Sequence, residues 1–209
     1  MLQNKQASIT PATFRMTSSQ EELLQQLETN LETGLTSDQA TQRREQEGSF
    51  NTVKPPIDCP AWLCIILPCI KHVPSMKAFA AIKPDDAEVM RSGKWIRYDA
   101  TSLVKGDIIR LEEGDVVPAD CAVLEVLEEE LLVELKGVTG EERPRSITRD
   151  APLTTLYMGG KVVQGGGTAV ITAIGSNTLL AKLIQEKRFP PREPVLEAEE
   201  TGIALRTLS

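Results

Sequence analysis

The middle of the chain alternates between short β-type hydrophobic runs and turn residues. From residue 88 to residue 174 the runs are rich in Val, Ile and Leu, and glycine-containing pairs such as Ser92-Gly93 and Gly106-Asp107 separate them. The runs that predict strands are residues 95–98, 108–111, 121–127, 131–135, 157–163 and 168–174. Short strands at this spacing predict a compact all-β sandwich.

Helical spacing marks the segment before this region. Ser18 or Ser19, followed three residues later by Glu21 or Glu22, makes a capping box, in which each side chain bonds the backbone amide of the other residue. Leucines then recur at helical spacing until Gly34. A first amphipathic helix is therefore predicted between the capping box and Gly34.

A second helix follows at once, and a third closes the β region. Thr36 with Gln39 repeats the capping pattern, and this helix should stop at Gly48, because glycine readily adopts the left-handed conformation of a C-cap. Residues 177–187 again carry aliphatic residues at helical spacing, and two prolines follow them. The predicted fold class is mainly β with flanking helices: an N-terminal helical pair and a C-terminal helix around the sandwich.

Prolines bracket the most apolar stretch of the chain, residues 61–67. This run is shorter than the roughly 20 residues that a membrane-spanning helix needs, so it does not span a bilayer by itself. Trp62 favours membrane interfaces, and Lys71 and Lys77 follow it, which is consistent with contact between residues 59–70 and a membrane surface. Burial of the run against the sandwich is an equal alternative.

Three of the four cysteines lie in this stretch, at Cys59, Cys64 and Cys69, with His72 close behind. Their gaps lack the close pairing that brings two thiolates onto one zinc ion, so no metal site is predicted. Acylation of a cysteine beside the apolar run is a better interpretation than zinc, and burial as small hydrophobic side chains is better still.

An acidic balance narrows the possible function classes. Lys plus Arg is 23 and Asp plus Glu is 30, which gives a formal net charge of -7 and disfavours attraction to nucleic-acid phosphates. Aromatic residues are only 4%, too few for base-stacking platforms. With 41% hydrophobic and 25% charged residues, the composition is that of ordinary globular proteins. We therefore predict a globular protein with no nucleic-acid partner.

Shifts of composition divide the chain into five stretches. The first 19 residues carry basic and hydroxyl side chains but no acid, which favours a disordered tail, with a transit-like peptide as the alternative. The predicted boundaries are a disordered tail at 1–19, the helical pair at 20–53, a Pro/Cys-rich apolar connector at 54–87, the sandwich with its closing helix at 88–188, and a disordered acidic tail at 189–209.

Three motifs in the β region occur in a characteristic order. They are Gly106-Asp107-Ile108-Ile109-Arg110-Leu111, Gly114-Asp115-Val116-Val117-Pro118-Ala119-Asp120 and Val138-Thr139-Gly140-Glu141. In that order and spacing they resemble the actuator domain of P-type cation-transporting ATPases, and residues 34–40 resemble the amino-terminal helical signature of the proton and calcium pumps. The resemblance covers residues 20–52 and 88–187 and implies that the sandwich is a distorted jelly roll.

The resemblance gives the Thr-Gly-Glu triplet a chemical role. In the family this loop swings into a phosphorylation domain and hydrolyses an aspartyl phosphate, which requires a carboxylate that orients and deprotonates a water molecule. Thr139, Gly140 and Glu141 supply that set, because the glycine leaves room for the phosphoenzyme and Glu141 accepts the proton. The motif residues expected to maintain the fold instead are Gly106, Asp107, Gly114, Asp115, Pro118 and Asp120.

The chain departs from the family pattern on both sides of this loop. The family has Asp-Glu-Ser-Ala-Leu or Asp-Gln-Ser-Ala-Leu before it and Ser-Leu-Pro after it. Here the corresponding residues are Glu134-Leu135-Lys136-Gly137-Val138 and Glu142-Arg143-Pro144. Glu142 places a second negative charge beside Glu141, where a phosphate would dock, and Lys136 and Arg145 are expected to offset it only partly.

Two motifs of ATP chemistry are missing from the sequence. It contains no Asp-Lys-Thr-Gly-Thr phosphorylation motif, and its glycine-rich stretches do not continue as a phosphate-binding loop. We therefore expect no catalysis by this chain alone and no cofactor in it, with Mg and ATP entering only through a partner. The expected function is a non-catalytic module that docks on or regulates a P-type ATPase or another membrane protein at the cytosolic face of a membrane, with the cytosol as the alternative location.

Two alternatives remain open for the function. One is a fragment or split subunit of a cation or proton pump, in which Glu141 promotes aspartyl-phosphate hydrolysis in trans. The other is a sandwich that has been reused as a scaffold, with the loop no longer functional.

Overall fold

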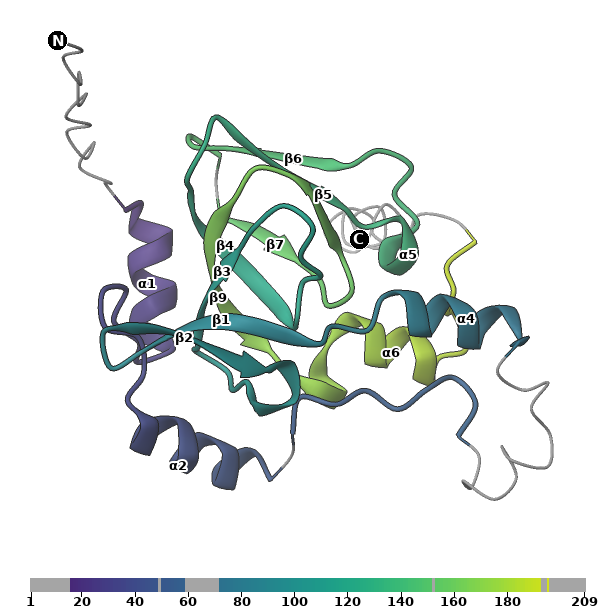
Figure 1. Cartoon of the computed structure of the whole chain (residues 1–209), viewed down its shortest axis with the longest axis horizontal. Helices are drawn as coiled ribbons and strands as arrows, with labels where there is room; N and C mark the ends of the chain where they lie inside the picture. The colour runs from purple at the N-terminus through teal and green to yellow at the C-terminus, as the bar shows by residue number, and fades with distance from the viewer. Residues whose placement is uncertain (1–15, 49, 59–71, 152, 193–194, 196–209) are drawn as a thin grey trace, which may run out of the picture.

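Two antiparallel sheets share one core in the computed structural model, which describes residues 16–48, 50–58, 72–151, 153–192 and 195 (Figure 1). The larger sheet has six strands in the order β2-β1-β3-β9-β4-β7, and the smaller sheet has three in the order β6-β5-β8. The strands are β1 (Asp86–Arg91), β2 (Lys94–Asp99), β3 (Ile108–Leu111), β4 (Asp120–Val126), β5 (Glu130–Glu134), β6 (Arg145–Thr148), β7 (Thr154–Leu156), β8 (Lys161–Gln164) and β9 (Gly167–Ala173). The predicted fold class, mainly β with flanking helices, is confirmed.

The main hydrophobic core lies between the two sheets. Side chains alternate between the two faces of a strand, so Ile109 and Leu111 of β3 point toward the same cluster as Val133 of β5. Each of these three is at most 2% exposed. Burial of such aliphatic side chains is the main free-energy gain that holds the sheets together.

Helix α1 (Ser18–Gln26) covers the outer face of the larger sheet. Its Leu24 packs with Ile108 of β3 and Val170 of β9 in a second buried cluster. The larger sheet is therefore buried on both faces along its central strands, which agrees with the mostly apolar sequences of β3 and β9.

The start of α1 lies one residue earlier than predicted. Its N-cap is Thr17, and not Ser18 or Ser19, and the capping box forms between Thr17 and Gln20. The Gln20 side chain also donates a hydrogen bond of 2.8 Å to the buried carbonyl of Leu124 in the sheet. This tertiary contact fixes the register of the helix, so the local Ser and Glu pattern does not decide where it begins.

The end of α1 was also predicted wrongly. The helix stops at Gln26 and does not continue toward Gly34. Glu28 adopts a left-handed conformation with φ 48°, and the Thr29 amide donates to the Leu24 carbonyl at 3.0 Å. This is a Schellman-type C-cap, which glycine normally forms, so a glutamate in that position gave no signal in the sequence.

The other helices agree with the prediction except for two additions, α4 (Pro74–Ala81) and the single turn α5 (Lys136–Thr139). Helix α2 (Ser37–Glu47) has the predicted capping box of Thr36 and Gln39, and it ends at Gly48, whose φ is +61°. Helix α6 (Leu179–Gln185) lies inside the range predicted for the C-terminal helix. Helix α4 (Pro74–Ala81) was not predicted. It begins with a proline at its first turn, a position that lacks a helical hydrogen bond in any case. Short 3-10 turns, η2 (Ala100–Ser102) and η3 (Gly175–Asn177), complete the elements.

One predicted strand is partly wrong. The run 157–163 was expected to be extended throughout, but Gly159 has φ +91° and makes a turn between β7, which ends at Leu156, and β8, which begins at Lys161. The short strands β1, β6 and β7 were absent from the predicted set, because their exposed positions carry polar residues that conceal the strand pattern.

The candidate membrane-contact stretch lies outside the described residues. Trp62, Cys59, Cys64 and Cys69 all belong to it, so membrane contact and acylation there remain predictions from the sequence. Among the helices that the structure describes, none combines the length and the apolar character needed to cross a membrane.

Candidate functional site

The Thr139-Gly140-Glu141 triplet lies on the connection between β5 and β6, the paired strands of the smaller sheet. A single helical turn, α5 (Lys136–Thr139), follows β5, and Figure 1 shows it beyond the end of that strand. Gly140 ends the turn in a left-handed conformation with φ +79°. Because side chains with a Cβ avoid this conformation, glycine is needed here to reverse the chain toward β6.

The base of this loop is anchored in the interior. Val138 is fully buried in the cluster that also contains Leu180 of α6 and Ile82, which follows α4. Thr139 is also fully buried, and its hydroxyl oxygen lies 3.2 Å from the carbonyl oxygen of Leu135. The loop therefore has a fixed base at Val138 and Thr139, whereas Lys136, Gly137 and the residues from Gly140 to Arg145 are at least partly exposed.

The Glu141 carboxylate is held by two neighbouring side chains. The Thr139 hydroxyl donates to Oε1 at 2.9 Å. The Arg145 guanidinium donates through Nη2 to Oε1 at 2.5 Å and through Nε to Oε2 at 3.3 Å. The side chains of Arg145 and Glu141 are 22% and 24% exposed, so this two-pronged ion pair lies at the surface but is partly shielded from water.

The Arg145 guanidinium is itself fixed by groups from another part of the chain. Its Nη1 donates to the carbonyl of Thr155 at 2.6 Å, just before the end of β7. Its central carbon lies 5.7 Å from the centre of the Tyr157 ring, within the range of a cation–π contact. The guanidinium position therefore does not depend on Glu141 alone.

The second carboxylate beside the loop has a cation of its own. Lys136 Nζ lies 3.2 Å from Glu142 Oε2, and both side chains are largely exposed. The sequence led us to expect that Lys136 and Arg145 offset the charges of the two glutamates only partly. In the structure each glutamate pairs with one of these cations, so the like charges of Glu141 and Glu142 are locally balanced.

This arrangement favours binding over proton transfer. A general base needs a lone pair directed at the water that it activates. Oε1 of Glu141 already accepts from both Thr139 and Arg145, and Oε2 accepts from Arg145. As placed, Glu141 is a charge-paired acceptor, and the groups that could recognise an anion are the cations around it.

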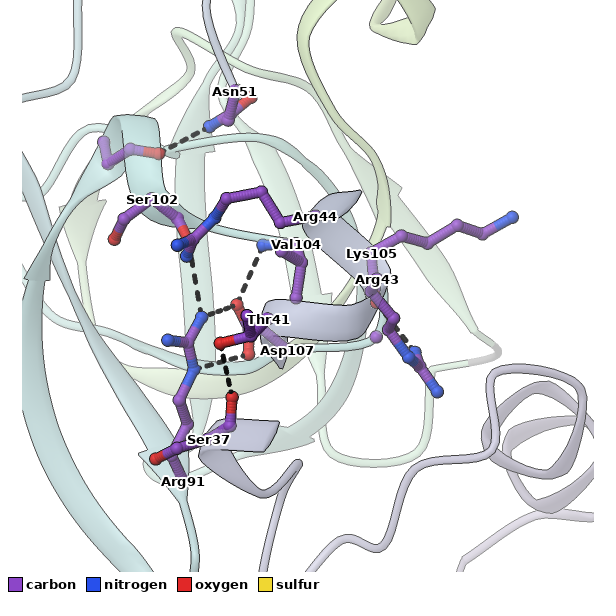
Figure 2. Close-up of polar contacts among 12 residues, drawn as sticks. Ser37, Thr41, Arg43, Arg44, Asn51, Arg91, Ser102, Val104, Lys105 and Asp107 are labelled. Atoms are coloured by element: carbon purple, nitrogen blue, oxygen red, sulfur yellow. Dashed lines mark hydrogen bonds and ion pairs between the residues drawn. The ribbon is translucent and has the colours of Figure 1, made fainter. Parts of the chain in front are cut away.

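The first Gly-Asp motif lies elsewhere, where the N-terminal helices meet the larger sheet. Asp107 is fully buried, accepts from the Val104 amide, and forms a two-pronged ion pair with the buried Arg91. The Arg91 Nη2 also lies 3.4 Å from the carbonyl of Ser102 (Figure 2). Burial lowers the pKa of Arg91, but hydrogen bonding and attraction to Asp107, with a smaller effect of Tyr98, outweigh burial and raise it, so the guanidinium stays charged.

Helix α2 is attached to the same region by backbone carbonyls. Figure 2 shows that Arg44 donates to the carbonyl of Ser102, at 2.7 Å, and Arg43 to that of Lys105, at 2.8 Å. Gly106 fits closely beneath Arg43: a Cβ added at Gly106 would lie 2.1 Å from Arg43 Nη1. The Gly-Asp motif is therefore a joint between the helical pair and the sandwich.

The buried side-chain amide of Asn51 links the same region to the segment that precedes α6. Asn51 donates from Nδ2 to the carbonyls of Ala100 and Pro118, each at 2.9 Å, and accepts from the Gly175 amide at 3.0 Å. Asn51 was not singled out in the sequence, since an isolated asparagine after a helix has no distinguishing pattern. Its full set of partners explains why it is only 2% exposed.

The second Gly-Asp motif makes local turns and also connects to distant parts of the chain. Gly114 lies in an exposed turn with φ +96°, and Asp115 accepts from the Glu112 amide at 2.8 Å. Asp120 accepts from the amides of Met158, at 2.9 Å, and Leu179, at 2.7 Å, and thereby ties β4 to the start of α6. Burial raises the pKa of Asp120 to about 6, although both hydrogen bonds oppose that shift.

The structure does not bring these motif residues together into one site. The Thr-Gly-Glu loop is a surface feature of the smaller sheet, and the first Gly-Asp motif leads into β3 of the larger sheet. The second motif begins beside β8 of the smaller sheet, where the Val162 amide donates to the carbonyl of Asp115 at 2.9 Å, and ends in β4 of the larger sheet. In the described ranges, no group of three or more His, Cys, Asp or Glu residues is placed to hold a metal ion. Cys121 is fully buried, and burial raises the pKa of its thiol, which makes it unreactive.

The chain matches sequence families of P-type and cation-transporting ATPases. Residues 81–187 match the sequence family described as the P-type ATPase actuator domain, and residues 17–69 match the family described as the N-terminus of cation transporters/ATPases. Among solved structures, a zinc-transporting PIB-type ATPase in its E2.Pi state is similar over 57% of this chain and 19% of its own, with 22% identity and a TM-score of 0.44.

Curated relatives are ATPases that are much longer than this chain. The probable plasma membrane ATPase of Dictyostelium discoideum is 36% identical over 100 residues, which is 46% of this chain and 9% of that protein. Calcium-transporting ATPase 1 of Schizosaccharomyces pombe is 32% identical over 147 residues, 65% of this chain and 16% of that protein. The sodium/potassium-transporting ATPase subunit alpha of Hydra vulgaris is 31% identical over 115 residues, 52% of this chain and 11% of that subunit. The chain thus spans at most about a sixth of these relatives.

Proposed function

The chain belongs to the P-type ATPase actuator-domain family, and on this basis we propose that it is an actuator module that docks on a membrane cation pump and modulates the pump without catalysing a reaction by itself. The module would present the Thr139-Gly140-Glu141 loop to the phosphorylation domain of the pump. Mg and ATP would belong to that partner. The expected location is the cytosolic face of a membrane, with the cytosol as the alternative.

One observation carries this proposal: the loop keeps the shape of a docking element while its carboxylate is already paired. The buried Thr139 and the left-handed Gly140 support a projecting turn. Glu141, which the family resemblance makes the water-activating residue, is bound to Arg145 through both carboxylate oxygens. The loop is structurally intact, but the carboxylate that would act as the general base is held in an ion pair. This combination supports docking more than hydrolysis.

Sedimentation with membranes tests the docking. The full chain is mixed with membranes that contain a calcium-transporting or plasma-membrane ATPase, and the bound fraction is measured together with the ATPase rate of the pump. Arg143→Glu reverses an exposed charge beside the loop. It should weaken binding by about tenfold or more if this loop forms the centre of the contact.

The matched control is Lys94→Glu, which makes the same charge change at an exposed position on β2, in the other sheet. This variant should bind as the wild type does. Equal binding by both variants would show that the loop is not part of the contact. The alternative of a sandwich reused as a scaffold would then remain. A wild-type chain that neither binds the membranes nor changes the ATPase rate would contradict the proposal.

Hydrolysis in trans is a second candidate, supported by the hydrogen bond between Thr139 and Glu141. This bond fixes the position of the carboxylate, which a water-activating residue also requires. If Glu141 acts on an aspartyl phosphate of another chain, the wild-type module should speed the decay of a pump phosphoenzyme, and Glu141→Gln should abolish that effect. Phosphoenzyme decay that is the same with both modules would rule out this candidate.

A further inference from the structure

We propose that Arg145 is an anion-recognition residue that exchanges partners: its guanidinium, paired with Glu141 in the free protein, transfers to a phosphate-type oxyanion, and this transfer frees the Glu141 carboxylate. The inference rests on the proposed function, since it names the chemistry that this loop would recognise on a partner. The ligand class is a phosphate or phosphoryl group that carries two negative charges.

The geometry of Arg145 provides for such an exchange. Its Nη1 remains fixed to the carbonyl of Thr155 and its guanidinium lies over the ring of Tyr157, and neither contact involves Glu141. Loss of the glutamate partner therefore does not release the arginine. The edge formed by Nε and Nη2 is the part that Glu141 occupies, and this edge is the one that would change partners.

The chemistry of the two anions makes the exchange favourable. A guanidinium binds phosphate oxygens through the same parallel pair of N–H bonds that it uses for a carboxylate. A dianion gains more from this contact than a monoanion does, and the pair at 22% and 24% exposure is within reach of a ligand from solvent. The exchange makes and breaks no covalent bond, because only the hydrogen-bonded ionic partner of Arg145 changes.

The charge around the loop supports the same ligand class. Between residues 136 and 149 the chain has four cations and two acids, although the whole chain has a net charge of -7. These residues are Lys136, Arg143, Arg145, Arg149, Glu141 and Glu142. Arg143 is exposed and forms no ion pair with any residue that the structure describes. Among the described residues of this stretch, Arg143 is therefore the exposed, unpaired cation that attracts an anion toward Glu141, although Glu134 and Asp150 directly outside this stretch make the wider segment neutral.

Glu141 acts as an internal competitor in this scheme. A ligand can use the Arg145 edge only in the fraction of molecules in which Glu141 has left it, so the apparent affinity is lowered by that fraction. Removal of the negative charge of Glu141 should therefore strengthen phosphate binding. A simple electrostatic effect of equal size would also follow from removing the charge of Glu142, which pairs with Lys136 instead. These two substitutions separate the two explanations.

The test uses nuclear magnetic resonance of the arginine Nε–Hε groups in the full chain. Inorganic phosphate is added at constant ionic strength, with sodium chloride as the reference salt. The Arg145 signal should shift with saturation. The Arg149 signal should stay in place, since its Nε and Nη2 donate to the carbonyls of Val126 and Leu127. Glu141→Gln should raise the apparent affinity by about fivefold or more, and Glu142→Gln by less than about twofold.

Three results would overturn the inference. They are an Arg145 signal that phosphate does not move, equal effects of Glu141→Gln and Glu142→Gln, and unchanged phosphate binding in Arg145→Gln. Thermal unfolding shows whether each variant is folded, and these exposed or half-exposed positions allow substitution. The titration contains no pump, so its outcome is independent of whether the module docks on one.

Discussion

Arg91 and Asp107 form a buried two-pronged ion pair, with Nε 3.0 Å from Oδ1 and Nη2 2.6 Å from Oδ2. The side chains are 6% and 0% exposed. The cation comes from the end of β1, and the anion belongs to the first Gly-Asp motif directly before β3. The pair therefore fixes the register of two neighbouring strands at the point where α2 is attached.

Loss of one partner of this pair should be strongly destabilising. Asp107→Ala leaves the Arg91 charge buried and the Val104 amide without its acceptor, which should lower the free energy of unfolding by about 3–5 kcal/mol. Denaturation by urea measures this change. The double variant Arg91→Met, Asp107→Leu should cost less than the sum of the two single variants, by at least about 1 kcal/mol. Strictly additive costs would show that the two charges do not interact.

The two Gly-Asp glycines should differ in their tolerance of a side chain. Gly106→Ala brings a Cβ within 2.1 Å of Arg43 Nη1 and 2.8 Å of Thr29 Oγ1, in addition to the strain of φ +88°. Gly114→Ala has a similar φ of +96° but no atom within 4 Å. We expect losses of about 3 kcal/mol and about 1 kcal/mol in unfolding free energy. The paired comparison separates the joint with α2 from backbone strain, and equal losses would mean that the joint contributes nothing.

Asp120 should make stability depend on pH. Burial raises the pKa of Asp120 to about 6 in the folded protein, whereas a carboxyl in the unfolded chain titrates near about 4. Between these values the folded state binds the extra proton, so the contribution of Asp120 is fully present below about pH 4 and is lost as the pH rises through about 6. Across this window the stability of the wild type relative to Asp120→Asn should fall by up to about 3 kcal/mol.

Urea denaturation of both proteins at several pH values measures that difference. The comparison with Asp120→Asn cancels the contributions of other titrating groups, such as Glu47, whose pKa burial also raises. A constant difference between the two proteins across the window would show that Asp120 does not hold its proton more tightly in the folded state.

The capping register of α1 can be tested with three single alanine substitutions. Thr17→Ala removes the side chain that caps the helix and should cost about 1 kcal/mol of stability. Ser18→Ala and Ser19→Ala lie inside the first turn and should change the unfolding free energy by less than about 0.5 kcal/mol. A larger effect at Ser18 than at Thr17 would support Ser18 as the N-cap, as the sequence suggested.

The sequence predicted those parts of the fold that depend on short-range chemistry. The capping box of Thr36 and Gln39, with Gly48 at the helix end, was recognisable because both ends of α2 use side chains close to it. The end of α1 was not recognisable, since Glu28 occupies a left-handed position that glycine usually takes. The start of α1 depends on the contact between Gln20 and Leu124, which lie 104 residues apart.

In the candidate site too, the features that depend on nearby residues were predictable and those that depend on distant contacts were not. The order of the motifs predicted where the loop lies, and the residue types predicted its chemistry. The pairing of Arg145 with Glu141 was not predicted as a specific contact, because it depends on how β6 leaves the loop and on groups of Thr155 and Tyr157 from a later strand and turn. An arginine four residues after the glutamate, in a segment with an excess of cations, was the only available signal.

Among the strands that the structure describes, β9 (Gly167–Ala173) comes last in the sequence, yet it lies between β3 and β4 in the middle of the larger sheet. During synthesis on the ribosome, β3 and β4 therefore emerge before β9, and each of them has one unpaired edge until β9 joins the sheet. Such non-local pairing makes folding slow and leaves the nascent chain open to misassembly with other chains.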